Sequence, residues 1–248
     1  MREKGKLLPI VLATAAVTAL PAASAEANTV TVGSTLTASG FSVLPFGPSA
    51  TVANYSLPAP ATAASPVDGT VVSWRFIGEG GPLTPRVLRS VSGTMLTGAS
   101  TGTPQNASAP GVISGPFPAN IPIKSGQFFG VDGASGAGLA TAPTASAVSL
   151  YFEPALINGD AGQSPTGTNA EEDALSAVVR FCLVPKLKGL TGRAARQALQ
   201  AADCQLGQIT RAGKKRHRVK RVRTQSVKAG KSISDTQPID LTISRKKK

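Results

Sequence analysis

Aromatic residues and histidine are scarce in this chain of 248 residues: aromatics make up 4% and there is a single histidine, His217. So few rings argue against a carbohydrate-binding surface built from several stacked aromatics. A serine triad needs a base beside its nucleophile, and His217 lies in a run of basic residues rather than among candidate nucleophiles. We therefore predict a binding protein rather than an enzyme.

A secreted glycan hydrolase remains the alternative from the enzyme class, because glycosidases need only two carboxylates. Each candidate carboxylate lies beside Gly or Pro or in a polar tract, where such groups are commonly solvated turn residues. No spacing typical of a calcium-binding loop occurs, so we predict no metal and no cofactor. The candidate carboxylates are Asp68, Glu79, Asp132, Glu153, Asp160 and 171–173.

Long apolar runs are also missing, except near the start of the chain. Arg2, Lys4 and Lys6 precede an apolar stretch over 7–20, and small residues at 23–25 follow. This three-part pattern is typical of a secretory signal peptide over 1–25, and a stretch of 14 residues is too short for a membrane span. We expect a protein that is secreted, extracellular or cell-wall associated, with no transmembrane segment after cleavage.

The chain has two cysteines, Cys182 and Cys204. An even number in an exported protein predicts one disulfide, with two buried free thiols as the alternative. By the chain-entropy relation, such a bridge would stabilise a domain of this size by about 3 kcal/mol.

Charge divides the chain in two. Residues 26–180 contain five Lys or Arg against nine Asp or Glu, whereas residues 181–248 contain eighteen against three. The net charges are therefore −4 and +15. We predict two domains, over 26–180 and 181–248.

The segment 26–180 is rich in Gly, Pro, Ser, Thr, Ala and Val, and short apolar runs alternate in it with turn-forming clusters. This pattern predicts a mostly β fold, a jelly-roll-like β-sandwich, with Trp74 in its core. The runs 64–69 with 72–75, and 123–132, resemble secreted β-sandwich modules of soil actinobacteria, a likeness that implies no particular activity. The expected strands are 29–38, 69–77, 86–97, 127–131, 147–152 and 174–181.

In the C-terminal segment, Thr191 is a good helix N-cap, and apolar positions recur on one face to about Asp203. Three strands should follow, over 206–211, 218–225 and 239–244, the last with strict apolar and polar alternation. The segment is therefore predicted to form a small α+β domain with one helix on a three-stranded sheet.

The same segment resembles the PASTA domain of penicillin-binding proteins and bacterial serine/threonine kinases. The resemblance implies binding of peptidoglycan, through its uncrosslinked stem peptides, or of β-lactams. The sequence departs from the family pattern at 227–228, where a proline is usual, and around 236–237, where a glycine is usual. The matching positions are Val184, Pro185, Leu187, Gly189, Leu190, Thr191, Ala195, Leu199, Ala202, Gly207, Gln225, Ala229, Gly230 and 241–244.

A dense run of basic residues supplies the candidate binding site for a wall polymer or another polyanion, because such runs attract polyanions whatever their sequence. A solvated, solubilising loop and tail is the alternative, and so is an adhesive protein that binds polyanions without stereospecificity. Phe181 is the only aromatic residue from that position onward, so no specific nucleic-acid binding is expected. The candidates are Lys214, Lys215, Arg216, Arg218, Lys220, Arg221 and Arg223, with a basic tail over 245–248.

Overall fold

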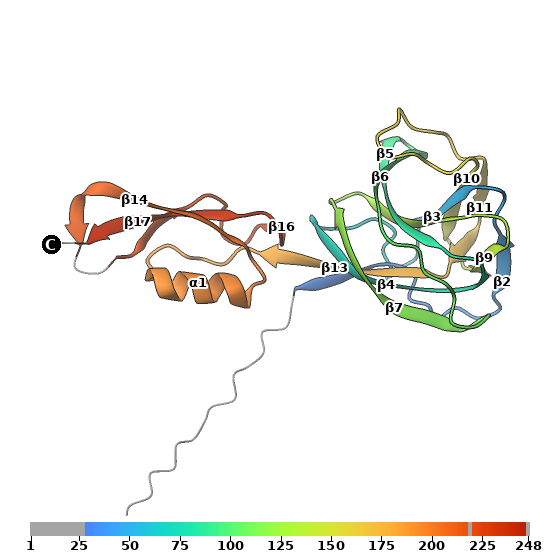
Figure 1. Cartoon of the computed structure of the whole chain (residues 1–248), viewed down its shortest axis with the longest axis horizontal. Helices are drawn as coiled ribbons and strands as arrows, with labels where there is room; N and C mark the ends of the chain where they lie inside the picture. Colours follow the sequence, from blue (N-terminus) through green and yellow to red (C-terminus); the bar gives the residue numbers. More distant parts are fainter. Residues whose placement is uncertain (1–27, 218–219, 247–248) are drawn as a thin grey trace, which may run out of the picture.

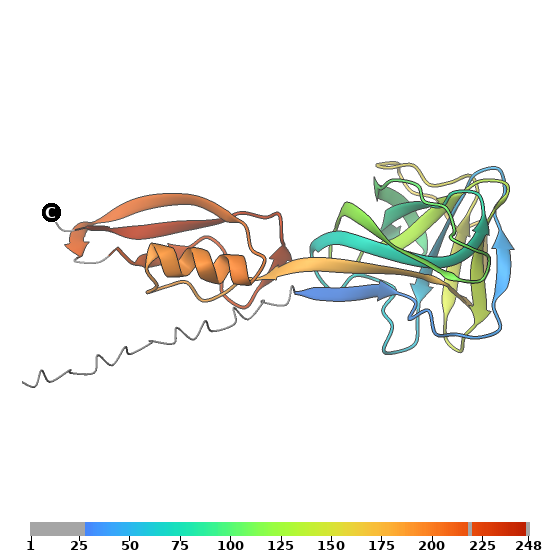
Figure 2. The ribbon, with the colours of Figure 1, turned by 60° about the horizontal axis from the view of Figure 1, so that its bottom comes forward.

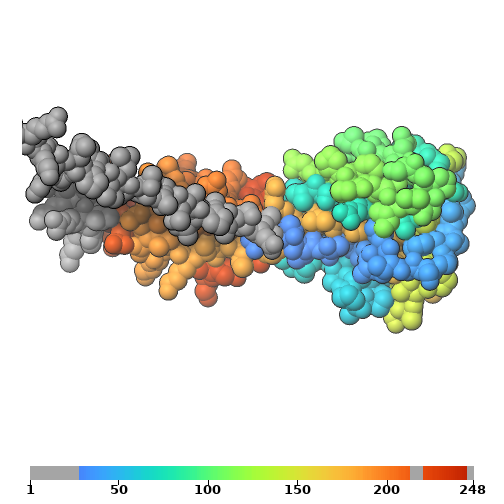
Figure 3. All heavy atoms as spheres, turned by 90° about the horizontal axis from the view of Figure 1, so that it is seen from below, coloured from blue at the N-terminus to red at the C-terminus, as the bar shows by residue number. Residues whose placement is uncertain are grey.

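The computed structural model describes residues 28–217 and 220–246, which form a β-sandwich and a smaller domain arranged end to end (Figure 1). The elongated arrangement is equally plain after rotation (Figure 2). Seen from below, the first residues of strand β1 (Thr29–Gly33) lie at the join between the two bodies (Figure 3). The predicted signal peptide lies outside the described residues.

Two sheets build the sandwich, and the predicted mostly β fold is confirmed. The first has the order β1-β13-β4-β9-β12, with β7 also paired to β4 and β2 to β9. Its strands after β1 are β13 (Leu175–Leu183), β4 (Gly69–Gly80), β9 (Ala137–Pro143), β12 (Glu171–Asp173), β7 (Ile113–Ile123) and β2 (Ser42–Pro45). The second has the order β11-β10-β3-β8-β5-β6. Its strands are β11 (Gly167–Asn169), β10 (Val148–Phe152), β3 (Ala50–Ser56), β8 (Phe128–Gly133), β5 (Thr84–Ser92) and β6 (Met95–Thr101).

The sandwich core is packed around Trp74, which is 1% exposed, as the sequence predicted. Its ring stacks on Phe76 at 5.2 Å between centroids and meets Phe129 edge-on at 6.1 Å. Such aromatic pairs add to the stabilisation that burial of their apolar area provides. The chain's single tryptophan is therefore a packing residue.

Two expected strands end earlier than predicted. Positions 86–97 do not form one strand, because the chain turns at Gly93, where φ is 53°, and separates β5 from β6. β1 stops at Gly33, where φ is 101° and a Cβ atom would meet the Leu175 carbonyl oxygen. Only glycine adopts such a backbone without strain, so these two residues set the strand ends.

The small domain has one helix and a three-stranded sheet, as predicted. Helix α1 (Gly192–Ala201) begins after Thr191, whose Oγ1 accepts a hydrogen bond from Ala194 N at 3.2 Å. The sheet has the order β14-β17-β15, with β17 parallel to β14 and antiparallel to β15. Its strands are β14 (Leu206–His217), β15 (Val222–Gln225) and β17 (Ile239–Lys246).

The predicted disulfide between Cys182 and Cys204 is present. Both cysteines lie in the core of the small domain, together with Ala195 and Leu199 of the helix and Leu241 of the sheet. The bridge therefore ties the strand that enters this domain to the chain just after α1.

The two domains share β13. Its central residues pair with β1 and β4 inside the sandwich, whereas residues 181–183 pair with β16 (Ser232–Ser234) of the small domain. The boundary expected at 180/181 thus falls inside a continuous strand. Just beyond β16, the Asp235 carboxylate accepts hydrogen bonds from Thr70 Oγ1 at 2.6 Å and Arg180 Nε at 2.8 Å.

Candidate functional site: the basic face of the small domain

The basic run predicted from the sequence falls at one end of the three-stranded sheet. Lys214, Lys215 and Arg216 belong to strand β14. Because β14 and β17 run parallel, Arg216 pairs with Arg245 of β17. The fold therefore brings the backbone of this part of the run beside Arg245 and Lys246, at the end remote from the sandwich (Figure 1). Arg218 and the side chains of 213–219 and 245–248 lie outside what the structure describes.

The remaining predicted site residues differ in what they contact. Arg221 donates from Nη1 to the Gly189 carbonyl oxygen at 2.7 Å, and its backbone N–H bonds Ser244 Oγ at 3.0 Å. Arg221 thus ties the loop before α1 to the sheet, a structural role. Arg223 on β15 is exposed and Lys220 is half-buried, so both can offer charge to a ligand. Whether this set binds a polyanion stays a prediction.

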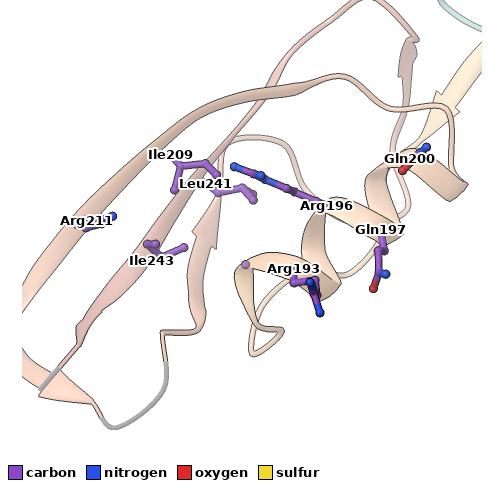
Figure 4. Close-up of a pocket in the computed structure, with 9 residues that line it drawn as sticks. Arg193, Arg196, Gln197, Gln200, Ile209, Arg211, Leu241 and Ile243 are labelled. Carbon is purple, nitrogen blue, oxygen red and sulfur yellow. The ribbon is translucent and has the colours of Figure 1, made fainter.

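A hollow of about 810 Å³ lies between α1 and the strands β14 and β17. Its apolar wall is formed by Ile209, Leu241 and Ile243 of the two strands (Figure 4). Arg196 extends from α1 toward Ile209 and Leu241, whereas Arg193 and Gln197 point away from the strands in this view. The residues that line it are Gly192, Arg193, Arg196, Gln197, Gln200, Ile209, Arg211, Leu241 and Ile243.

Three arginines surround this hollow. Arg193, Arg196 and Arg211 are all exposed, and none forms an ion pair within residues 28–217 and 220–246. A guanidinium offers a planar set of donors that matches the two oxygens of a carboxylate or phosphate. The hollow therefore combines an aliphatic surface with cationic groups whose donors are available.

Sequence reasoning missed this hollow as a site. Arg193 and Arg196 lie on the helix face opposite to the apolar one, and Arg211 lies at the end of the expected strand 206–211, but the pattern of each element gives no sign that the three line one hollow. Their proximity depends on the parallel pairing of β14 with β17 and on how α1 lies across the sheet. Tertiary packing, rather than local spacing, assembles this feature.

Two of the carboxylates considered for hydrolysis, Asp132 and Asp68, have structural partners in the sandwich. Asp132 forms an ion pair with Arg86 at 2.6 Å and accepts from Thr51 Oγ1 at 2.6 Å. Burial raises the pKa of Asp132 above its usual value, although Thr51 and Arg86 act to lower it. Asp68 accepts a bond from the Ser125 backbone N–H at 2.9 Å.

Asp173 is the most deeply buried carboxyl group among the described residues. It is 0% exposed and neither carboxyl oxygen has a hydrogen-bond partner there. Burial raises its pKa to about 8; the nearby Ser149 hydroxyl acts to lower it, and the neighbouring Glu171 and Glu172 add to the rise. Its backbone instead bonds the Asn54 side chain, which donates to the Asp173 carbonyl and accepts from its N–H.

Within the described ranges, no helix has the length and hydropathy needed to cross a membrane. The same residues hold no group of three or more His, Cys, Asp or Glu side chains suited to a metal ion.

Comparison with curated proteins gave no match, and comparison with solved structures gave none either. A family model does match the C-terminal part of the chain, over residues 183–245. This range covers α1, all three strands of the sheet, β16 and the hollow, and it agrees with the family resemblance found in the sequence. The small domain of this protein is therefore a PASTA domain.

Proposed function

We propose that this protein is an exported, non-enzymatic cell-envelope protein that binds peptidoglycan or an anionic wall polymer through its PASTA domain. The observation that carries the proposal is the family match over 183–245, since PASTA domains are associated with ligands of the bacterial cell wall. The signal-peptide pattern at the start of the chain and the disulfide both suit an oxidising compartment outside the cytoplasm.

The charge distribution supports the same function. Residues 181–248 carry a net charge of +15, and the register of β14 with β17 gathers two basic segments at one end of the domain. This end lies far from the sandwich, so a wall polymer could bind there while the sandwich faces outward (Figure 1). A non-enzymatic role also suits the sandwich carboxylates Asp132 and Asp68, whose hydrogen bonds hold the fold together.

The test is retention of the mature protein by purified peptidoglycan sacculi at about 0.05 and about 0.5 M salt, which span weak and strong screening. Stereospecific recognition should survive the higher salt. Complete release at high salt would favour the second candidate, an adhesive protein that binds polyanions by charge alone. No retention at either salt would rule out wall binding.

A matched pair of variants locates the contribution of the basic run. Replacing Lys214, Lys215 and Arg216 by glutamine should lower retention at low salt. With fewer positive charges on the protein, fewer counterions are released from the polyanion when the two bind. The acidic-to-neutral variant Asp160→Asn, on the surface of the sandwich, should leave retention unchanged. Equal behaviour of the two variants would remove the basic run from the site.

A further inference from the structure

Another pocket lies in the sandwich, at the end remote from the small domain. We call it the loop pocket; it has a volume of about 430 Å³ and lies between the segments that follow β1, β3 and β9. Gly33, the last residue of β1, pairs with Ser176 near the start of β13, whereas the other end of β13 enters the small domain. In Figure 1, β9 likewise lies on the side of the sandwich away from the small domain. The lining residues come from 35–39, 58–61 and 143–145, and from Glu172 of β12.

Glu172 is the only charged residue among those that line the loop pocket. It is 5% exposed, and its Oε1 is buried with no hydrogen-bond partner among the described residues. Neither of the two ion pairs found in residues 28–217 and 220–246 involves it. A buried carboxylate oxygen without a partner costs free energy, because the hydrogen bonds that it makes to water in the unfolded chain are not replaced. A ligand that donates a hydrogen bond to this oxygen would recover that cost.

The charge around Glu172 favours a cation as that donor. Glu172 is the middle one of three consecutive acidic residues that form β12. Next to it, Asp173 has a pKa that is raised by burial, lowered in part by the Ser149 hydroxyl, and raised further by the charges of its two acidic neighbours. Residues 26–180 carry a net charge of −4, and no Lys, Arg or His is among the residues that line the pocket. A positive group bound beside Glu172 would therefore reduce the repulsion among these carboxyl groups.

The lining residues restrict which cation fits. They offer Ca²⁺ a single carboxylate, although Ca²⁺ usually takes about six to eight oxygen ligands, several of them from carboxylates. A quaternary ammonium group has no N–H to donate, and no aromatic ring is among the lining residues to receive it. A primary ammonium group combines a compact positive charge with three N–H donors, so it suits an unpartnered carboxylate oxygen best.

Proline and alanine form most of the remaining wall of the loop pocket. Pro58 and Pro60 lie in a turn that is closed by a hydrogen bond from Ala61 N to the Pro58 carbonyl oxygen at 3.1 Å. Because proline rings fix the backbone angle φ, this part of the wall is formed before a ligand arrives. Thr35 and Thr37 are exposed, and their hydroxyl groups bond one another at 2.7 Å. The pocket therefore offers aliphatic carbon near one buried carboxylate, which suits an ammonium group on a short alkyl chain.

We infer that the loop pocket is a binding site for a small primary amine. Glu172 holds its ammonium group, and its aliphatic stem lies against Pro58, Pro60 and Pro143. The site belongs to the sandwich, so it is separate from the wall-binding function proposed for the small domain and does not depend on it. With a single charge and a small apolar area, the pocket should bind such an amine with a dissociation constant in the millimolar range.

The probes share a pentyl chain and differ in the group at its end: 1-aminopentane, 1-pentanol and trimethylpentylammonium. Amide proton–nitrogen correlation spectra of the full mature protein follow each titration at about pH 7 and up to about 50 mM ligand. We expect 1-aminopentane to shift signals from 35–39, 58–61 and 143–145. It should bind at least about fivefold more tightly than either of the other two, because only its end group joins a positive charge to N–H donors.

Two variants and a matched control locate the site. Glu172→Gln should weaken binding of 1-aminopentane about tenfold or more, since a charge-assisted hydrogen bond is lost. The control Glu171→Gln removes the same charge from the adjacent residue, whose side chain is on the opposite face of β12 and does not line the pocket. It should change the dissociation constant less than about twofold. Ala145→Phe, at an exposed lining position, fills the pocket without changing its charge and should also abolish binding.

Equal losses in Glu172→Gln and Glu171→Gln would show that only the net charge of β12 matters, and would overturn the inference. So would equal binding of 1-aminopentane and 1-pentanol, shifts confined to residues outside the pocket, or no shift at about 50 mM ligand. The same spectra show whether each variant is folded. If Glu172→Gln is not, Ala145→Phe decides the question, because it blocks the pocket and leaves the carboxylate in place.

Discussion

At the scale of single residues, Asp173 shows how burial couples protonation to stability. Its ordinary pKa near 3.8 is raised to about 8 in the folded protein, chiefly because both carboxyl oxygens are removed from water. The folded chain then keeps a proton that the unfolded chain releases between about pH 4 and pH 8. Stability should therefore decrease as the pH rises through this window and level off above it.

Asp173→Asn tests this coupling, because an amide stays neutral at every pH and can donate to the nearby Ser149 Oγ, which forms no hydrogen bond among the described residues. The variant should unfold at a temperature higher than the wild type by about 5 °C or more at pH 8, with little difference at pH 4. Thermal unfolding followed by circular dichroism at pH 4, 6 and 8 measures it. The exposed control Asp160→Asn should show no such pH dependence; a constant offset at all three values would refute the assigned cause.

Single residues also mark what the sequence could and could not predict of the site. Thr191 as the helix cap, and the two cysteines as a pair, follow from local chemistry, and both are confirmed. That Arg196 and Arg211 line the same hollow could not be predicted, because the two residues belong to different elements. Only the packing of α1 against the sheet places both beside the hollow.

At the scale of elements, strands with clear apolar alternation were predicted well, whereas two kinds of strand were missed. β9 is built largely from Ala, Gly and Thr, and β3 contains only Val52 and Tyr55 as larger apolar residues, so neither strand gives much hydrophobic signal. β7 contains Pro116, Pro118 and Pro122, which argue against a strand in the interior of a sheet. Among the described strands, β7 pairs only with β4, and residues without a backbone N–H are tolerated on its other edge.

The disulfide between β13 and the end of α1 should matter more to the small domain than to the sandwich. It closes a loop with a sequence separation of 22, for which chain entropy predicts a stabilisation of about 3 kcal/mol. Cys182→Ala/Cys204→Ala should therefore lower the unfolding transition of the PASTA domain by that amount. Urea unfolding with and without reductant measures it: the variant should be insensitive to the reductant and the wild type sensitive.

The sandwich provides the internal reference for this measurement. Fluorescence of Trp74 reports on the sandwich core alone, since it is the only tryptophan and is 1% exposed. Its transition should move much less than that of the small domain. A single transition that shifts as a whole would instead show that the two domains unfold together.

At the scale of the whole molecule, the contacts around Asp235 fix one domain on the other. Asp235 is 9% exposed and Thr70 is 2% exposed, so their hydrogen bond is shielded from water. Arg180, whose side chain is 43% exposed, adds a more weakly held ion pair. The Asn28 side chain also bonds the Ala202 carbonyl oxygen across the same join.

Asp235→Ala should loosen this join. The loss leaves the buried Thr70 hydroxyl without its acceptor, at a cost of about 1–2 kcal/mol, while the exposed Arg180 adds little. Distances between spin labels placed in the two domains should spread over a wider range than in the wild type. Asp203→Asn, at a position with φ of 52° that asparagine also tolerates, is the control. Identical distance distributions in all three proteins would show that β13 alone fixes the arrangement.

The shared strand also determines how the molecule would respond to mechanical load. β13 lies between β1 and β4, hydrogen-bonded on both sides, before it continues into the small domain. If the small domain is held on a surface while the sandwich is pulled away, the tension runs along β13. The hydrogen bonds to both neighbours are then loaded together in shear rather than broken one after another, so this strand would act as the tether through which the sandwich resists being pulled off.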